Sequence, residues 1–335
     1  MNMTSIGDLA NSIMLRQRSV QLSQNISTLS QELSSGQVSD VSGRLGGDYS
    51  YLTDIDRNLA RLDGFAVSAS EAAMFSGSAQ TSLERLHDLS ASLSSSLITF
   101  DATSTDALRE HLAVRAEADI ASAISALNAS AGGRSLFGGT ATDRQPLGTA
   151  DTLMGELRAL VTGLTTAGDV EMAVDTWFAD PAGFETAMYQ GSDDLLAPIQ
   201  IGEGEEVSLA LTAQDPVFRD TLRDMALAAL AGDPDLGFDR ATQDNLFRTA
   251  SEGMLANQDS LTGVRADLGF AEARIEEISA RNSAARTSLE YSRAALLEAD
   301  PFETATRLEE AQFQLESLYT VTVRSANLSL LNFLS

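Results

Sequence analysis

The first apolar residues of the chain follow the spacing of a coiled-coil helix. Gaps of four and three residues alternate along one stripe: Leu15, Ser19, Leu22, Ile26, Leu29 and Leu33. This spacing places all of them on one face of an α-helix. It predicts a helix over residues 5–35, which Ser34 and Ser35 weaken and Gly36 ends, because glycine readily takes the left-handed conformation of a helix cap.

The same periodicity predicts two more helices in the first half of the chain. One covers residues 49–98, with Leu52, Ile55, Leu59 and Leu62 on its apolar stripe. The other begins after the capping residues of 101–105 and continues to Gly132 and Gly133. Both stripes are typical of helices that pack lengthwise in a bundle.

The periodicity fades in the middle of the chain, where charge takes over. Residues 145–245 contain 19 acidic residues and four arginines, more than half of the net negative charge of the whole chain. We expect short helices near 150–165 and 216–231, and a hairpin in which residues 198–201 and 207–211 flank Gly202-Glu203-Gly204. This composition indicates a separate, solvated middle domain.

Regular heptads return at Leu261 and hold for five repeats, to Leu296. Asp300 and Pro301 then predict a new helix, with Asp300 as N-cap and Glu303 completing a capping box. Its stripe includes Leu308, Leu315 and Leu318, but Phe313, Val321 and Val323 lie off it. A helix that is apolar on several faces has to be enclosed by other protein.

Together these elements predict a mainly α protein: a long coiled-coil helical bundle, made from the amino- and carboxyl-terminal segments, with an inserted acidic α+β middle domain. The expected domains are an amino-terminal assembly helix and loop, the first half of the bundle, the middle domain, the second half of the bundle and a carboxyl-terminal assembly helix, at 1–48, 49–140, 141–245, 246–299 and 300–335.

Both ends of the chain carry more apolar side chains than one mutual seam can cover, and contiguous exposed apolar surface marks sites of association. Burying each leucine contributes about 1.5–3 kcal/mol, so several per subunit suffice to drive assembly. We therefore expect self-association through the following residues: Leu15, Leu22, Ile26, Leu29, Leu33, Leu308, Leu315, Leu318, Val321, Leu328, Leu330, Leu331, Phe333 and Leu334.

Charge narrows the classes of partner. The formal net charge is −26, and all 22 basic residues are arginine. Such a surface repels nucleic acid and anionic lipid. The apolar carboxyl end is about half the roughly 20 residues that span a bilayer, so we expect no membrane insertion. No cleaved secretory signal is evident at the amino end, and the absence of cysteine excludes disulfides and thiolate metal sites.

Catalytic chemistry has little support in the residues, and we expect no catalytic, cofactor or metal site. Without lysine there is no Walker lysine and no Schiff base. His87 and His111 lack metal-ligand spacing, and residues 233–244 fit a turn and a helix cap better than a calcium loop. Asp193 and Asp194 resemble the opening of a helix. A soluble coiled-coil hydrolase or metal-binding protein, with its site in 145–245, remains an alternative.

Residues 300–334, DPFETATRLEEAQFQLESLYTVTVRSANLSLLNFL, resemble the carboxyl-terminal signature of the bacterial flagellin family, and the helix that ends at Leu33-Ser34-Ser35-Gly36 is similar to its first helix. Within the family, Arg134-Ser-Leu-Phe-Gly-Gly-Thr140, with Thr142, Asp143 and Pro146, resembles the hook-associated members at the hook-filament junction. After Gly36, however, the chain has Gln37, Val38 and a glycine-rich loop where many filament flagellins carry a basic pair and paired aspartates.

The resemblance implies an extracellular structural subunit of the bacterial flagellum that joins hook to filament. It implies copies of itself, a hook-side junction protein and flagellin as partners. It also implies type III export without a cleaved signal peptide, with an export chaperone on the carboxyl-terminal helix before secretion. A filament-forming flagellin is the alternative within the family.

Overall fold

A computed structural model describes the backbone of residues 3–100 and 105–334 and the side chains of residues 10–100 and 105–324. The chain forms two compact units. Unit 1 comprises residues 1–62 and 284–335, and unit 2 comprises residues 63–283. Among the described residues, no helix is both long enough and apolar enough to span a membrane.

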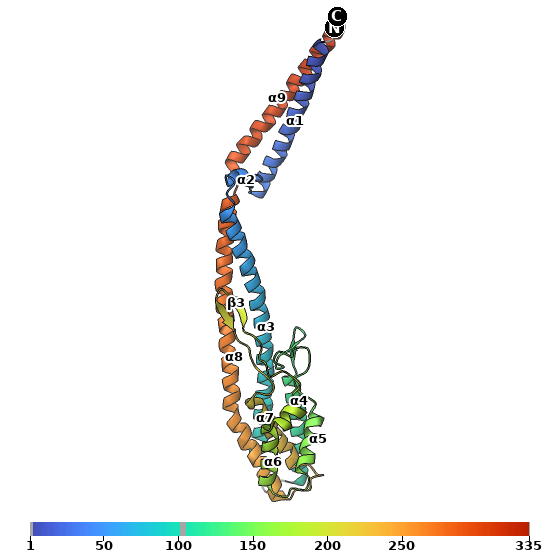
Figure 1. Cartoon of the computed structure of the whole chain (residues 1–335), viewed down its shortest axis with the longest axis vertical. Coiled ribbons are helices and arrows are strands. Elements are labelled where there is room, and N and C mark those ends of the chain that lie inside the picture. Colours follow the sequence, from blue (N-terminus) through green and yellow to red (C-terminus); the bar gives the residue numbers. More distant parts are fainter. Residues whose placement is uncertain (1–2, 101–104, 335) are drawn as a thin grey trace. The chain divides into compact units, whose positions relative to one another are not determined.

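Unit 1 is built around two long terminal helices, α1 (Met3–Ser35) and α9 (Pro301–Leu334), which pack against each other (Figure 1). The short helix α2 (Val41–Arg44) follows α1, and the unit also includes the first part of α3 (Ser50–Ile98) and the last part of α8 (Arg240–Leu297). The Asp56 carboxylate on α3 lies 2.9 Å from the Arg293 guanidinium on α8.

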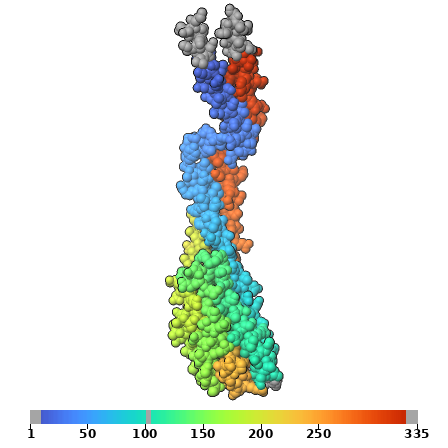
Figure 2. Space-filling view, turned by 90° about the vertical axis from the view of Figure 1, so that its right-hand side faces the viewer, coloured from blue at the N-terminus to red at the C-terminus, as the bar shows by residue number. Residues whose placement is uncertain are grey.

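Unit 2 holds the main hydrophobic core. Its helices are the remainder of α3 and α8, together with α4 (Asp106–Leu127), α5 (Ala150–Val161), α6 (Ala167–Ala179) and α7 (Pro216–Ala231); η1 (Pro181–Glu185) is a short π-helical turn. In Figure 2, the green-to-yellow segments of this unit form one compact mass.

Helix α7 lies at the centre of the unit 2 core. Its residues from Asp224 to Ala231 are all buried, and it packs against α4. Apolar side chains of α3, α4 and α8 complete the core, among them Leu83, Leu86, Leu93, Ile120, Ile124, Leu246, Phe247 and Met254.

The strands are few and short. Strand β1 (Ser130–Ala131) pairs antiparallel with β2 (Arg134–Ser135), and β3 (Ile199–Gly202) pairs antiparallel with β4 (Glu205–Val207). Gly132 and Gly133, which join β1 to β2, have φ angles of 57° and 80°. A two-residue hairpin turn with both φ angles positive requires residues of this kind.

The predicted fold class is confirmed: the protein is mainly α-helical with a small β-containing insert. The predicted starts and ends of α1, α3, α7 and α9 agree with the structure to within two residues. Several details differ. The third helix ends at Leu127, because Asn128 caps it and the chain turns into β1.

Helix α8 starts at Arg240, within the predicted turn and helix cap of 233–244, and the sequence patterns above do not predict α6 and η1. Two expectations need correction. Strand β4 ends at Val207, before the predicted strand residues 208–211. Asp193 and Asp194 lie in a loop rather than at a helix start, where Asp194 accepts a backbone hydrogen bond from Thr140 that ties this loop to residues 138–142.

Candidate assembly surface

The predicted stripe of α1 packs against α9 within one chain. Leu29 is buried, and Leu15, Leu22 and Ile26 are half-buried. Leu33 continues the stripe but is 41% exposed. At that end of α1 the buried position belongs to Glu32, whose carboxylate accepts a hydrogen bond of 2.7 Å from the backbone N–H of Ser39.

The apolar stripe of α9 packs against the stripe of α1 and forms the other side of the same seam. Ala311 and Thr304 are buried, and Leu308, Leu315 and Leu318 are half-buried. Val321, in contrast, is exposed. Asp300 fixes the start of the helix, because its Oδ1 accepts from the backbone N–H of Phe302 at 2.8 Å and of Glu303 at 3.1 Å.

Backbone hydrogen bonds join the segment just after α1 to the end of α8 and to the linker that precedes α9. Val38 N–H donates to the carbonyl of Leu297 at 2.9 Å, and Ala299 N–H donates to the carbonyl of Gly36 at 2.9 Å. Gly36 has a φ of 69°, as the sequence predicts for the cap of α1. These bonds keep the two terminal helices together as a pair.

The outward faces of the pair also carry apolar side chains. On α1, Ile13 and Val20 are 50% and 52% exposed, and they lie seven residues apart on the face opposite the seam. On α9, Phe302 and Phe313 are 82% and 70% exposed. These two are eleven residues apart, which is close to three full helical turns, so they share one outward stripe.

The seam between α1 and α9 therefore leaves part of the apolar surface of these helices exposed. Further exposed apolar or aromatic residues of the pair are Met14, Tyr319, Val321 and Val323. Exposed apolar residues on paired helices make this pair the candidate surface for association with other protein.

The predicted interface residues thus separate into three groups. Seven lie on the seam within the chain: Leu15, Leu22, Ile26, Leu29, Leu308, Leu315 and Leu318. Leu33 and Val321 are exposed. Leu328, Leu330, Leu331, Phe333 and Leu334 belong to the backbone of α9, but their side chains lie outside the described residues. That these residues contact other subunits stays a prediction.

The exposed residues Ile13, Val20 and Phe302 are not among those that the sequence indicates for association. The heptad pattern identifies one stripe per helix, and these residues lie on the opposite face. Ile13 and Val20 have i, i+7 spacing, and Phe302 and Phe313 have i, i+11 spacing. These spacings indicate a second stripe on each helix only when the seam is assigned to other residues.

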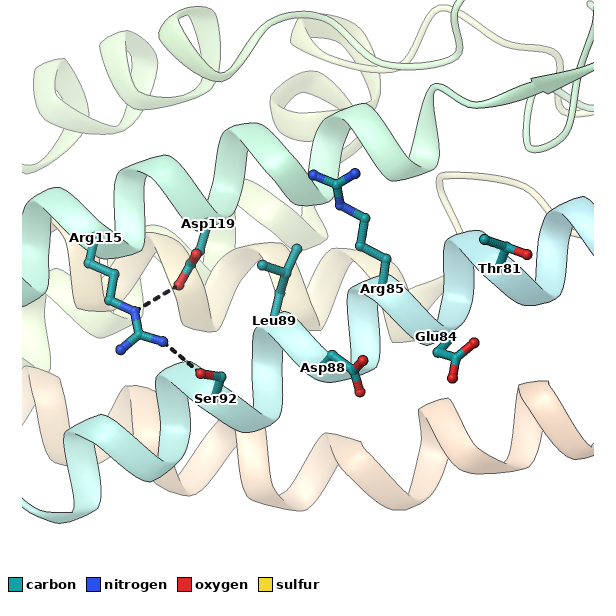
Figure 3. Close-up of a pocket in the computed structure, with 8 residues that line it drawn as sticks. All are labelled: Thr81, Glu84, Arg85, Asp88, Leu89, Ser92, Arg115 and Asp119. Atoms are coloured by element: carbon teal, nitrogen blue, oxygen red, sulfur yellow. Dashed lines mark hydrogen bonds and ion pairs between the residues drawn. The ribbon is translucent and has the colours of Figure 1, made fainter.

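A surface pocket of about 340 Å³ lies between α3 and α4, with Arg115 and Asp119 from α4 and the other lining residues from α3 (Figure 3). The Arg115 guanidinium lies 3.6 Å from Asp119 and donates to the hydroxyls of Ser92 and Ser96 at 2.6 and 2.8 Å. Burial raises the pKa of Asp119, and Arg115 opposes that shift.

This pocket has the character of a helix–helix contact. Arg115 bridges α3 to α4, and the other charged residues at the pocket, Glu84, Arg85 and Asp88, are exposed. In the described part of the chain, no three histidine, aspartate or glutamate side chains are grouped as metal ligands. Within 233–244, Asp239 caps α8, because its Oδ1 accepts from the backbone N–H of Thr242 at 2.8 Å. Asp233 and Asp244 instead pair with Arg158 and Arg109.

Two kinds of comparison with known proteins, with family models and with solved structures, give matches. Residues 256–334 match the model of the bacterial flagellin C-terminal helical region. Among solved structures, the chain is similar to one described as that of a flagellar hook-associated protein from Vibrio parahaemolyticus, at 14% sequence identity and a TM-score of 0.51. The match covers 75% of this chain and 99% of that chain. No curated protein is a significant relative.

Proposed function

We propose that this protein, whose residues 256–334 match the flagellin carboxyl-terminal helical region, is a structural adaptor of the flagellum. The protein joins the hook to the filament and assembles through its terminal helices. The observation that carries the proposal is the pairing of α1 with α9, which leaves Ile13, Val20, Phe302 and Phe313 exposed on outward faces.

A junction subunit has to meet different proteins on its two sides, so its contacts are heterologous. The outward faces of α1 and α9 suit such contacts, because they differ in sequence and charge. The similarity in fold to a protein described as hook-associated favours the junction over the filament, and so does the Arg134–Thr140 stretch.

The proposed partners are copies of the chain, a hook-side junction protein and flagellin. The proposal places the protein outside the cell, after type III export without a cleaved signal. Before export, an apolar carboxyl-terminal helix in water needs cover, and an export chaperone on α9 supplies it.

Electron microscopy of purified flagella, with this protein labelled by a specific antibody, tests the proposal directly. We expect label in one narrow band where the hook meets the filament. Label along the whole filament, in thousands of copies, would establish the filament-forming flagellin instead. Absence of label from intact flagella would reject both functions.

A soluble enzyme or metal-binding protein, with its site in residues 145–245, is the candidate of another class. Stoichiometric metal in the purified protein, measured by elemental analysis, distinguishes it from the structural role.

A further inference from the structure

We propose that Phe313 on α9 of one copy inserts into a hole on α1 of a neighbouring copy, formed by Ile13, Arg16, Gln17 and Val20. This inference rests on the proposed function, because it concerns how the terminal helices assemble. It names the residues that contact each other and the direction in which one copy contacts the next.

The hole is defined by spacing and by shape. Ile13, Arg16, Gln17 and Val20 stand at positions i, i+3, i+4 and i+7 of α1, the four positions that form a hole in knobs-into-holes packing. The same residues, with Gln21, line a depression of about 520 Å³ on the surface. The hole lies on the face opposite the seam, so the α9 of the same chain does not fill it.

The knob is Phe313, which points away from the seam formed by Leu308, Ala311 and Leu315. Glu309 and Glu316 flank it on the same stripe, four residues before it and three residues after it. Among the described side chains, neither glutamate forms an ion pair or a side-chain hydrogen bond. A large aromatic side chain with a rim of unpaired carboxylates is suited to an apolar hole with a basic rim.

Charge identifies the occupant of the hole as a second copy. Residues 9–31 contain no acidic residue and two basic ones, Arg16 and Arg18, whereas residues 309–323 contain three glutamates and no basic residue. No ion pair joins α1 to α9 among the described side chains, and Arg16 has no acidic partner there. Arg16, in the hole on α1, and Glu309 and Glu316, beside Phe313 on α9, therefore complement each other between chains. Arg18, two residues after Arg16, lies on another face of α1.

The direction of the contact follows from its geometry. Hole and knob lie on different helices, and each copy carries one of each, so the interface is heterologous. Such a contact repeats from copy to copy, and it closes into a ring or continues as a helix according to its rotation.

Disulfide trapping tests the contact, because the natural chain has no cysteine to interfere. Full-length Gln17→Cys and Phe313→Cys chains are mixed at concentrations well above the assembly threshold of the natural chain, because loss of the Phe313 ring weakens the contact, and are oxidised with copper phenanthroline. We expect cross-linked dimers that contain one chain of each kind, since a disulfide needs Cα atoms within about 7 Å. The matched control pairs Phe313→Cys with Ser27→Cys, which lies seven residues beyond Val20 on the same outward face, and we expect few cross-links.

Charge reversal supplies a second readout. Arg16→Glu and the double variant Glu309→Arg/Glu316→Arg should each raise the concentration needed for assembly about tenfold, through like-charge contacts. Combining all three changes in one chain should restore assembly. The aromatic control compares Phe313→Ser, which should raise the concentration needed for assembly at least about tenfold, with Phe270→Ser, which removes a similarly exposed ring (74%) from unit 2 and should have no effect.

The outcomes separate this inference from the function it rests on. If the natural chain assembles but the 17–313 cross-link is absent, or charge reversal is not rescued, the inference is wrong and the adaptor role stands. If the natural full-length chain does not assemble with itself or with flagellar partners, the proposed function fails. Circular dichroism of each variant confirms that its helices are intact.

Discussion

The guanidinium of Arg109 on α4 lies 2.7 Å from Asp244 Oδ1 on α8, and the two residues are 135 positions apart in the sequence. Arg109 is 2% exposed, and its guanidinium carbon stands 5.0 Å from the centre of the Phe100 ring. A buried guanidinium is costly unless it is paired, so this contact fixes how α4 meets the start of α8.

Arg109→Ala should lower the free energy of unfolding of unit 2 by about 2–4 kcal/mol. The change leaves a cavity and removes the partner of a carboxylate that is only partly exposed. Urea denaturation followed by circular dichroism measures the loss. Arg248→Ala is the matched control, because Arg248 pairs with Glu252 on the exposed surface of α8, where such pairs contribute about 0–1 kcal/mol. An equal loss in both variants would contradict the role of burial.

A buried carboxyl group predicts a pH dependence. Burial raises the pKa of Asp224 to about 7, although Arg223 opposes the shift, and Asp220 on α7 and Asp175 on α6 reinforce it. Asp224 Oδ1 accepts from Arg223 at 2.8 and 2.9 Å, while Oδ2 has no hydrogen-bond partner. The folded state therefore holds a proton on Asp224 that the unfolded chain, with an ordinary carboxyl pKa, releases.

Because the folded state binds more protons than the unfolded state, stability should fall as the pH rises from about 4 to about 7. Asp224→Asn keeps the shape of the side chain without the charge. Its free energy of unfolding should decline less over this range. The variant should therefore be more stable relative to the natural chain at pH 8 than near pH 4, where the two stabilities should match. Parallel pH profiles for the two proteins would show that Asp224 does not titrate in this window.

Gly183 is a position at which substitution should destabilise unit 2. It has φ −89° and ψ −108° inside η1, and a Cβ atom there would collide with the backbone carbonyl of Trp177. Gly183→Ala should lower the stability of unit 2 by about 2–4 kcal/mol, since backbone has to move to accept it.

Gly155→Ala is the control for this change. A Cβ atom at Gly155 meets nothing within 4 Å, and the residue lies exposed inside α5. Alanine there should stabilise the protein by about 0.5–1 kcal/mol, because glycine is the poorer helix former. Thermal unfolding of both variants checks the predicted opposite signs.

The terminal helices show how far sequence alone leads. The 3-4 spacing from Leu15 to Leu29 identifies the face of α1 that is buried, because period and burial have the same cause. The spacing does not reveal whether that face meets its own chain or another one. In the structure, that face packs against α9 of the same chain. The outward residues Ile13 and Phe302 therefore stay exposed, which the seam residues alone do not indicate.

The middle of the chain shows where prediction stops. Helix α7 has the ends expected from the sequence, and Pro216 suits its first turn. Helix α6, which was not predicted, has comparable features: Thr166 Oγ1 accepts from Asp169 N–H, and Val170, Val174 and Phe178 share one buried face. Contacts such as that of Arg109 with Asp244 join positions far apart in the sequence, and no local sequence pattern predicts them.

Removing the assembly surface gives the last prediction. A chain that lacks residues 1–40 and 305–335 loses the α1–α9 pair but keeps the whole of unit 2, whose core is formed by residues within 63–283. It should remain a folded monomer at concentrations where the natural chain assembles, because the apolar surface that drives association is gone. Light scattering coupled to size-exclusion chromatography measures the mass of each form. A truncated chain that still assembles with itself, or with hook or filament subunits, would locate the interface elsewhere, and the exposed Phe270 on α8 would then be the first position to test.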